Sequence, residues 1–380
     1  MEVQRLEVQH YDQLLNLLNT VFSRKNQRQM DFEKEMPKMC IRDSAHMECH
    51  IGIFDGERLV SCMGIYPFEA VVAGQTLRFA TTGNVATHWD YEGKGHMSAM
   101  LDVAMEELDR LNIDAARLGG LRSRYNRYGF EACGQNYSFT FTEKNRQRRL
   151  SDFETDIIFR EITSDDSDAI EFAADLYNQN AVAVPRKPEN AYLSMRMWLN
   201  TPFLALRGET PIGYLAANEA GNALAEFFAI DTTAAAQMIC AWQKRVGADL
   251  SFYTQPHQVD LTRLFSSVCE SSRIYSPSHF KICNWAKVID AFMKLKGSYC
   301  ELPSGELFVE ISDYGTVRVY VDGGDAGCEK VAHTPDLVLD KLSAARYFFG
   351  PYPPVYTGNA SLMAQVWFPL PLSWNPQDRV

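Results

Sequence analysis

The sequence predicts a mixed α/β protein (α+β class), in which two similar units precede a smaller third one. First, strand-like segments lead through a glycine-containing loop into a long amphipathic helix. Second, residues 203–254 repeat this order of strands and helix. Third, a length of 380 residues favours two to three domains. We therefore expect domains at 1–147, 152–283 and 284–380.

The composition excludes several classes of protein. The chain is 46% hydrophobic and 22% charged, which allows substantial cores and excludes a disordered protein. With 37 Lys and Arg against 48 Asp and Glu, the net charge is −11, so nucleic-acid binding is not expected. Nine cysteines without a CxxC pair, no apolar signal core and no run of 18 apolar residues favour a cytoplasmic protein without a membrane span. No spacing of Cys, His and Asp indicates a metal site.

Periodicity and turn signals place the elements of the first unit. A short strand and an amphipathic helix open the chain, and the Asp55-Gly56 pair indicates a hairpin. The apolar residues of 96–112 recur at helical spacing and form one face. The expected elements are strands at 48–54, 58–72 and 76–88, the helix at 96–112, and strands at 114–121 and 136–142.

A charged segment, 144–151, has no apolar periodicity and indicates a linker, with a solvated helix end as the alternative. In the second unit, Asp231 is the expected N-cap of a helix at 232–246. No glycine lies between Ile230 and this helix, so the unit resembles a copy that has lost an anion site. The other expected elements are a hairpin of 203–206 and 211–218 and strands at 224–230 and 250–254.

The third unit combines helices and alternating strands. The expected elements are helices at 285–295 and 335–348 and strands at 307–311 and 316–321. The tail at 367–380 carries three prolines, Pro369, Pro371 and Pro376, so we expect it to be extended.

The most informative motif is the segment 84–87 (NVAT) followed by 91–101 (YEGKGHMSAML). A glycine turn that opens a helix presents unpaired backbone N–H groups at the positive end of the helix dipole, which suits a diphosphate. Gly93 and Gly95 allow close approach, and Lys94 adds positive charge. The pattern is neither a P-loop nor a dinucleotide fingerprint. A simple strand-to-helix turn is the alternative.

Together with 125–130 (YNRYGF), this stretch resembles motif A of the GNAT superfamily of acetyl-CoA-dependent N-acetyltransferases. In outline, the three units resemble the Eis (enhanced intracellular survival) type, whose third domain is similar to a sterol carrier fold. The architectural resemblance covers nearly the whole chain, whereas the motifs cover about 84–130. The sequence departs from the usual motif at Glu92, which replaces Gln or Arg, and at Met97, which replaces a small residue.

The resemblance implies acetyl-CoA as co-substrate and assigns site residues one by one. The pantetheine arm would pair with the strand edge at Val85, Ala86 and Thr87, and the diphosphate would lie on Gly93, Lys94, Gly95, His96, Met97 and Ser98. Tyr125 would be the general acid for the departing thiolate, and the carboxylate of Val380 would be the base. His88, His96 and Glu92 are other candidates for the base near the loop.

The implied reaction is transfer of an acetyl group to an amine of a small molecule or of a lysine side chain. An alkylammonium has a pKa of about 10.4 and must lose a proton first, whereas a tyrosine is protonated at pH 7 and can donate. Tyr125 packed in the core without a catalytic role is the alternative for that residue. The alternative function is a non-catalytic binding protein of the same fold that holds an acyl or apolar ligand. The resemblance also implies a homo-oligomer, a hexamer in the Eis type.

Overall fold

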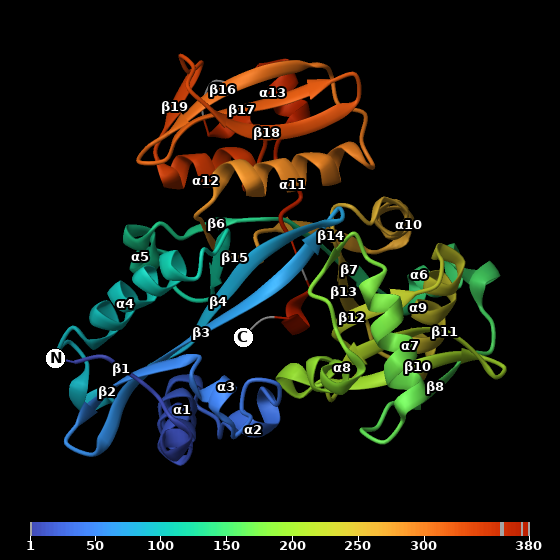
Figure 1. Cartoon of the computed structure of the whole chain (residues 1–380). Helices are drawn as coiled ribbons and strands as arrows, with labels where there is room; N and C mark the ends of the chain where they lie inside the picture. Colours follow the sequence, from blue (N-terminus) through green and yellow to red (C-terminus); the bar gives the residue numbers. More distant parts are fainter. Residues whose placement is uncertain (1, 358–360, 374, 379–380) are drawn as a thin grey trace.

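The computed structural model describes residues 2–357, 361–373 and 375–378. It has the mixed α/β fold that the sequence predicts, with thirteen α-helices and four sheets among the described residues. Figure 1 shows two sheet-containing bodies side by side and a third body, coloured orange to red, above them. No helix in the described ranges is both long and apolar enough to span a membrane.

The first body is built on an eight-stranded sheet with the order β1-β2-β3-β4-β5-β15-β6, in which β9 also pairs with β3. Helix α4 covers one face through Met100, Leu101, Ala104 and Leu108, all completely buried, as the helical spacing predicts. The strands are β1 (Gln4–Arg5), β2 (His50–Asp55), β3 (Arg58–Val72), β4 (Gln75–Thr87), β5 (Ala115–Leu118), β6 (Glu131–Cys133), β9 (Val182–Ala183) and β15 (Ser278–Ile282). The helices are α1 (Tyr11–Asn26), α2 (Phe32–Glu35), α3 (Ser44–Met47), α4 (His96–Arg110) and α5 (Arg122–Tyr125).

The second body contains a four-stranded sheet, β12-β11-β10-β8, and a three-stranded sheet, β13-β7-β14. Its strands are β7 (Asn136–Phe141), β8 (Ile158–Glu161), β10 (Thr201–Arg207), β11 (Thr210–Ala217), β12 (Leu224–Ala229), β13 (Leu250–Thr254) and β14 (Ser271–Tyr275). The helices are α6 (Glu143–Arg149), α7 (Ser167–Asn178), α8 (Pro188–Met195), α9 (Thr232–Val246) and α10 (Val259–Val268). Asp231 caps α9 as expected, because its carboxylate accepts a hydrogen bond from Ala234 N at 2.7 Å.

The first two bodies exchange strands. β7 lies within the predicted first domain, yet it pairs on both sides with strands of the second body, opposing Phe252 and Ser272 at Phe139. In return β15 lies between β5 and β6 of the first sheet, where His279 opposes Leu118 and Ala132. The sheets therefore do not follow the limits 1–147 and 152–283, and neither segment contains all the strands of its own sheets.

The predicted linker at 144–151 is wrong, because residues 143–149 form α6. Thr142 caps this helix and pairs reciprocally with Asn145. Arg146 is buried, and its Nε donates to Gln243 on α9 at 2.8 Å. The high charge of segment 144–151 therefore did not mean that all of its side chains are exposed, because the guanidinium of Arg146 joins α6 to α9.

The third body is a four-stranded sheet, β18-β17-β16-β19, packed against α11 and α12. Its elements are α11 (Trp285–Gly297), β16 (Gly305–Ile311), β17 (Gly315–Asp322), β18 (Asp325–Val331), β19 (Leu337–Leu339), α12 (Lys341–Phe349) and α13 (Leu362–Trp367). The single helix expected at 335–348 is wrong. Asp340 accepts hydrogen bonds from Leu342 N and Ser343 N, so α12 begins after it, and 337–339 form a strand parallel to β16. Likeness to a sterol carrier fold stays a prediction.

Candidate functional site

The site begins where strands β4 and β5 separate. Their parallel pairing joins Phe79–Thr82 of β4 to Ala115–Leu118 of β5 and ends there. Residues 83–87 continue as strand, but among the described residues they pair only with β3. The edge of β4 that faces β5 is therefore open at Val85 and its neighbours, and its backbone groups are available to another molecule.

A bulge shapes this open edge. Two residues of β4, Asn84 and Val85, oppose Met63 of β3, and Asn84 has a positive φ of 54°. The Asn84 amide donates to the Tyr66 hydroxyl at 2.7 Å, and Tyr66 lies 2.7 Å from His50 Nε2. Burial lowers the pKa of His50 to about 4 and raises that of Tyr66, so both groups are neutral at pH 7. A chain of neutral hydrogen bonds holds the bulge.

The glycine loop lies next to this edge and opens helix α4. Gly93 and Gly95 have φ values of 75° and 84°, which favour glycine, and a Cβ on either would meet no atom within 4 Å. The helical hydrogen bonds start at Ala99 N, which donates to Gly95 O at 3.1 Å. The N–H groups of the first helical residues, His96, Met97 and Ser98, thus have no intrahelical acceptor. The loop presents the open surface that the sequence predicts.

His96 fixes the loop to the sheet. Its Nδ1 lies 2.8 Å from Ser61 Oγ of β3, and Ser61 Oγ donates to Thr87 Oγ1 at 3.1 Å. Burial, with Lys94 nearby, lowers the pKa of His96. A neutral imidazole anchored in this way positions the helix start. His88, another candidate for the base, is buried, and its ring packs at a tilt against Trp89 with 3.9 Å between the ring centroids.

Two cations lie at the start of α4. Lys94 Nζ is 4.4 Å from the centroid of the Tyr91 ring. Arg127, which the sequence interpretation did not include, donates from Nη2 to Ser98 Oγ at 2.6 Å. It follows α5 and is exposed, as Glu92 is. Its place as the basic residue of the YNRYGF segment was the sequence signal that could have identified it. Arg127 thus adds positive charge at the start of α4.

Tyr125 lies at the end of α5, beyond the end of β5. Its side chain is 5% exposed and belongs to the same apolar cluster as Val85 and Met97. Gly120 makes room for the ring, since a Cβ there would lie 3.0 Å from Tyr125 Cε2. Burial raises the pKa of the phenol. The fold therefore brings the predicted acid, strand edge and loop to one side of the first sheet.

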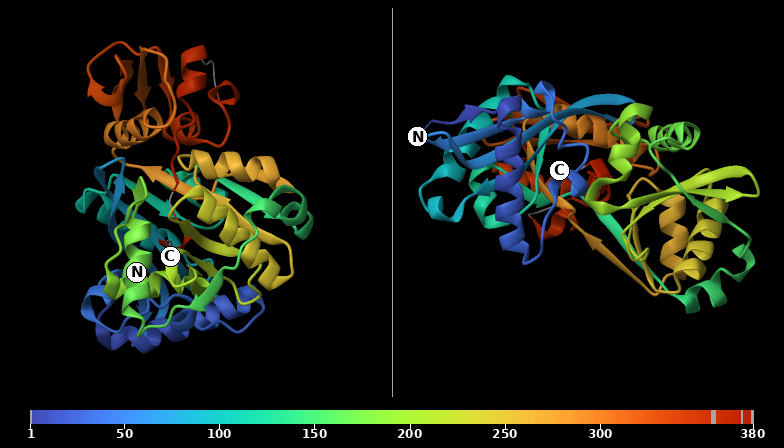
Figure 2. Two further views of the ribbon diagram at one scale, coloured as in Figure 1. Left: turned by 90° about the vertical axis from the view of Figure 1, so that its right-hand side faces the viewer. Right: turned by 90° about the horizontal axis from the view of Figure 1, so that it is seen from below.

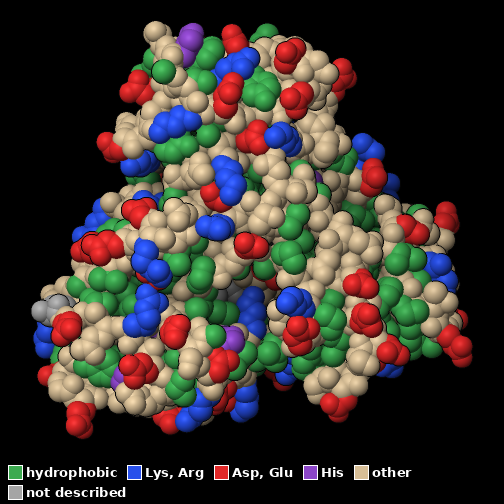
Figure 3. Space-filling view, in the orientation of Figure 1, with side chains coloured by type: hydrophobic (Ala, Val, Ile, Leu, Met, Phe, Trp, Pro, Cys, Tyr) green, Lys and Arg blue, Asp and Glu red, His purple; other side chains and the backbone are tan. Residues whose placement is uncertain are grey.

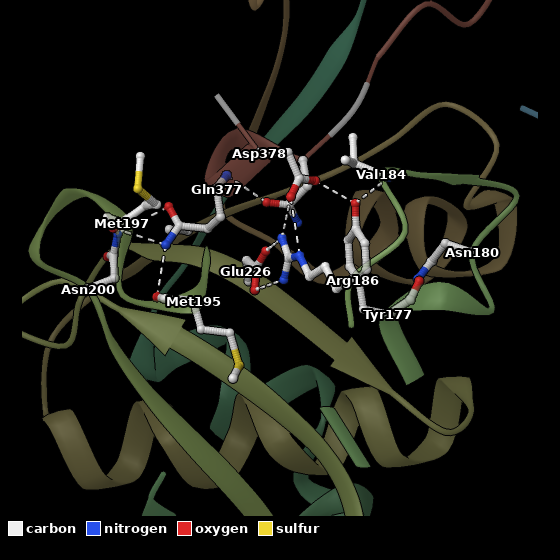
Figure 4. A network of polar contacts seen from close by, with 12 residues as sticks. Tyr177, Asn180, Val184, Arg186, Met195, Met197, Asn200, Glu226, Gln377 and Asp378 are labelled. Atoms are coloured by element: carbon white, nitrogen blue, oxygen red, sulfur yellow. Dashed lines mark hydrogen bonds and ion pairs between the residues drawn. The ribbon is translucent and has the colours of Figure 1, made fainter. Parts of the chain in front are cut away.

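The last described segment of the chain, η7 (Pro376–Asp378), lies between the first two bodies (Figures 1 and 2). Asp378 accepts from Arg186 Nη2 at 2.8 Å and from the Tyr177 hydroxyl, and Arg186 also pairs with Glu226 (Figure 4). Lys38 of the first body donates to Gln377 O at 2.8 Å. All three charged members of the Arg186–Glu226–Asp378 network are buried.

Figure 3 shows a hollow between the two lower bodies, with basic side chains inside it, near the C mark of Figure 1. The tail is thus fixed beside the hollow. Val380, the predicted base, lies outside the described residues, so its role stays a prediction.

The sequence matches the family model of the acetyltransferase (GNAT) domain over residues 2–133. The match includes the open edge of β4, the glycine loop, α4 and Tyr125, and it ends before β7.

Solved structures show the same fold over nearly the whole chain. A GCN5-related N-acetyltransferase from Anabaena variabilis has a TM-score of 0.69 at 16% identity, covering 99% of this chain and 98% of that one. Eis1 from Mycobacterium abscessus has a TM-score of 0.65 at 12% identity, and the match covers 99% of this chain and 98% of that one. A probable N-acyltransferase from Enterococcus faecalis has a TM-score of 0.65 at 18% identity, and the match covers 93% of this chain and 90% of that one. No curated protein matches the chain.

The second body has three successive antiparallel strands followed by a helix, as the first body has, but without the glycine loop. Among described residues, no ladder joins β12 to β13, and one isolated parallel bridge links Ser251 of β13 to Ala223, the residue before β12. Helix α9 follows β12 as α4 follows β4, but the Asp231 carboxylate occupies the helix start. A carboxylate at the helix start repels an anion. This agrees with the sequence, in which no glycine precedes the helix. Descent of this body from a second GNAT unit stays a prediction.

Among the described residues, no group of three His, Cys, Asp or Glu side chains could hold a metal ion.

Proposed function

We propose that the chain is an acetyl-CoA-dependent N-acetyltransferase that acetylates an amine of a small molecule or of a lysine side chain. The observation that carries this proposal is the open, bulged edge of β4 beside the glycine loop of the GNAT domain. The extended pantetheine arm of the cofactor needs an open strand edge, and its diphosphate needs a glycine loop at a helix start. The two features lie within a few residues of each other in the chain.

The residues fit coenzyme A in shape and charge. No atom would obstruct a group that approaches Gly93 and Gly95, because even an added Cβ meets nothing within 4 Å there. The first N–H groups of α4 and the positive end of its dipole favour a diphosphate. Lys94 and Arg127 add positive charge. In the proposal, Val85, Ala86 and Thr87 pair with the pantetheine arm, and Gly93–Ser98 hold the diphosphate.

The proposed chemistry is direct attack of the amine on the thioester carbonyl. Backbone N–H groups at the edge near Val85 would stabilise the developing oxyanion. The attacking nitrogen would lose a proton to the carboxylate of Val380, the proposed base, and Tyr125 would donate its proton to the departing thiolate and be reprotonated from water after transfer. A phenol is protonated at pH 7, and the raised pKa of Tyr125 leaves it so. Stabilising the oxyanion and protonating the thiolate would each lower the barrier to acetyl transfer.

Titration calorimetry with acetyl-CoA and with free CoA tests the binding step, and thiol release over a set of amines tests the transfer. We expect both nucleotides to bind and at least one class of amine to release thiol. Binding without thiol release from any amine would favour the alternative, a non-catalytic protein that holds an acyl ligand. Absence of binding by either nucleotide would reject both the cofactor and the reaction.

A further inference from the structure

A separate cavity of about 380 Å³ lies where the three bodies meet, away from the glycine loop. Its walls come from α5 and β6, from β14, and from α12 and the segment that follows it. The residues used below are Arg122, Glu131, Ile274, Tyr275, Arg346 and Tyr352. This volume lies in the range of small-molecule sites, which occur preferentially between domains.

One wall of the cavity carries an excess positive charge. Glu131 is completely buried and accepts hydrogen bonds from Arg122 Nε and Nη2 at 2.6 and 2.7 Å. The same carboxylate accepts a hydrogen bond from Nη1 of Arg346. The Nη2 group of Arg346 donates to Ser343 Oγ at 3.0 Å. Two guanidinium groups therefore share one carboxylate, and these three are the only charged residues among the described ones that line the cavity. The wall has a net charge of about +1 in a chain whose net charge is −11.

Both arginines remain accessible. The side chain of Arg122 is 54% exposed and that of Arg346 is 35% exposed, although each is paired with Glu131. A guanidinium has five N–H donors, and the contacts above use only some of them. The remaining donors can bind an acceptor in the cavity without displacing Glu131.

Other residues that line the cavity are apolar and aromatic. Ile274 and Tyr352 are 59% and 65% exposed, and Tyr275 is 36% exposed. Large apolar side chains gathered at one cavity lose unfavourable contact with water when a ligand covers them. A cavity lined by both an apolar surface and two arginines suits a ligand with one anionic end and an apolar body.

We propose that this cavity binds a small carboxylate with an apolar body. The carboxylate would lie on Arg346 and Arg122, and the apolar body would lie on Tyr352 and Ile274. A single negative charge neutralises the wall, whereas a neutral ligand leaves its charge unmatched. Arg122 belongs to the same short helix as Tyr125, so the ligand would contact the helix that carries the proposed acid.

Calorimetric titration of the full chain with octanoate, and with octanamide as its neutral match, tests the proposal. We expect saturable binding of octanoate at one site and binding of octanamide at least about tenfold weaker, the size of a charge-assisted contact. Arg346→Gln should weaken octanoate by about tenfold or more, while Arg122 still pairs with Glu131. Arg318→Gln is the matched control. Arg318 also bridges two carboxylates, Glu306 and Glu329, but lies on β17 outside the cavity.

Tyr352→Ala keeps the test decisive if Arg346→Gln fails to fold, because this exposed side chain contributes little to the core. It should weaken octanoate several-fold. The proposal is overturned if octanoate shows no saturable binding or if octanamide binds equally well. Equal weakening by Arg318→Gln and Arg346→Gln would also overturn it, and so would an unchanged affinity in Tyr352→Ala.

Discussion

Ser61 Oγ lies 2.8 Å from His96 Nδ1, and this contact joins strand β3 to the first turn of α4. The serine is completely buried and also bonds Thr87 at the end of β4. One hydroxyl therefore holds together the open strand edge and the start of the helix that carries the proposed diphosphate site. Its position connects the stability of the first sheet with the shape of the site.

Ser61→Ala should lower the free energy of unfolding by about 1–3 kcal/mol, because it leaves a buried imidazole nitrogen without its partner. It should also weaken CoA binding, because the helix start is no longer held to the sheet. Denaturant unfolding and calorimetry measure the two effects. Ser278→Ala is the matched control, since its buried hydroxyl bonds Leu118 O at 3.0 Å away from the loop. Equal CoA affinities in the two variants would contradict the positioning role of Ser61.

Gly95→Val should weaken CoA binding by about tenfold or more. A β-branched residue is strained at a φ of 84°, and its side chain would enter the space through which a diphosphate approaches. Gly208→Val controls for strain, because Gly208 has a φ of 61° and open space around it in the β10–β11 turn. If both variants bind CoA as the wild type does, the diphosphate lies elsewhere.

Tyr125→Phe should reduce kcat by about 10²-fold or more while the dissociation constant of acetyl-CoA changes little, because only the proton donor is lost. Thiol release and calorimetry measure the two quantities. Tyr347→Phe removes another buried phenol, in the third body, and should leave kcat unchanged. Turnover at the wild-type rate in Tyr125→Phe would remove this residue from the acid role.

The stability of the protein should fall on acidification between about pH 6.5 and pH 4. Burial lowers the pKa of His50 from 6.5 to about 4, so in this window the unfolded chain binds more protons than the folded one. Stability thus rises with pH there, and this histidine contributes up to about 3 kcal/mol above the window. His50→Gln should flatten the slope of unfolding free energy against pH, and the exposed His333→Gln should not. An unchanged slope in His50→Gln would contradict the assignment.

Arg186→Met should destabilise the protein by about 3–5 kcal/mol, because Glu226 and Asp378 would remain buried without their cation. Arg318→Met, at a partly exposed position, should cost at most about 1 kcal/mol. Denaturant unfolding compares the two. A loss below 1 kcal/mol in Arg186→Met would mean that the tail is not held by this network.

Local patterns were sufficient for many elements. The predicted limits of β3, α9 and β13 are those of the structure, because each is bounded by turn or capping residues next in sequence. The glycine loop was also predictable, since positive φ at Gly93 and Gly95 leaves few other residue types. Asp340 shows the limit of this approach: its capping role ends a strand and begins a helix within a stretch whose composition suggested one helix.

Local sequence patterns were enough to predict the mixed α/β class, the order of strands around the loop and a set of candidate site residues. The exchange of β7 and β15, the contact of Arg127 with Ser98, and the meeting of Arg186, Glu226 and Asp378 are visible in the folded chain alone. Distance along the chain accounts for this difference. Turns, caps and helical faces depend on neighbours a few residues away, whereas strand pairing and buried ion pairs join residues tens to hundreds of positions apart, which no local pattern specifies.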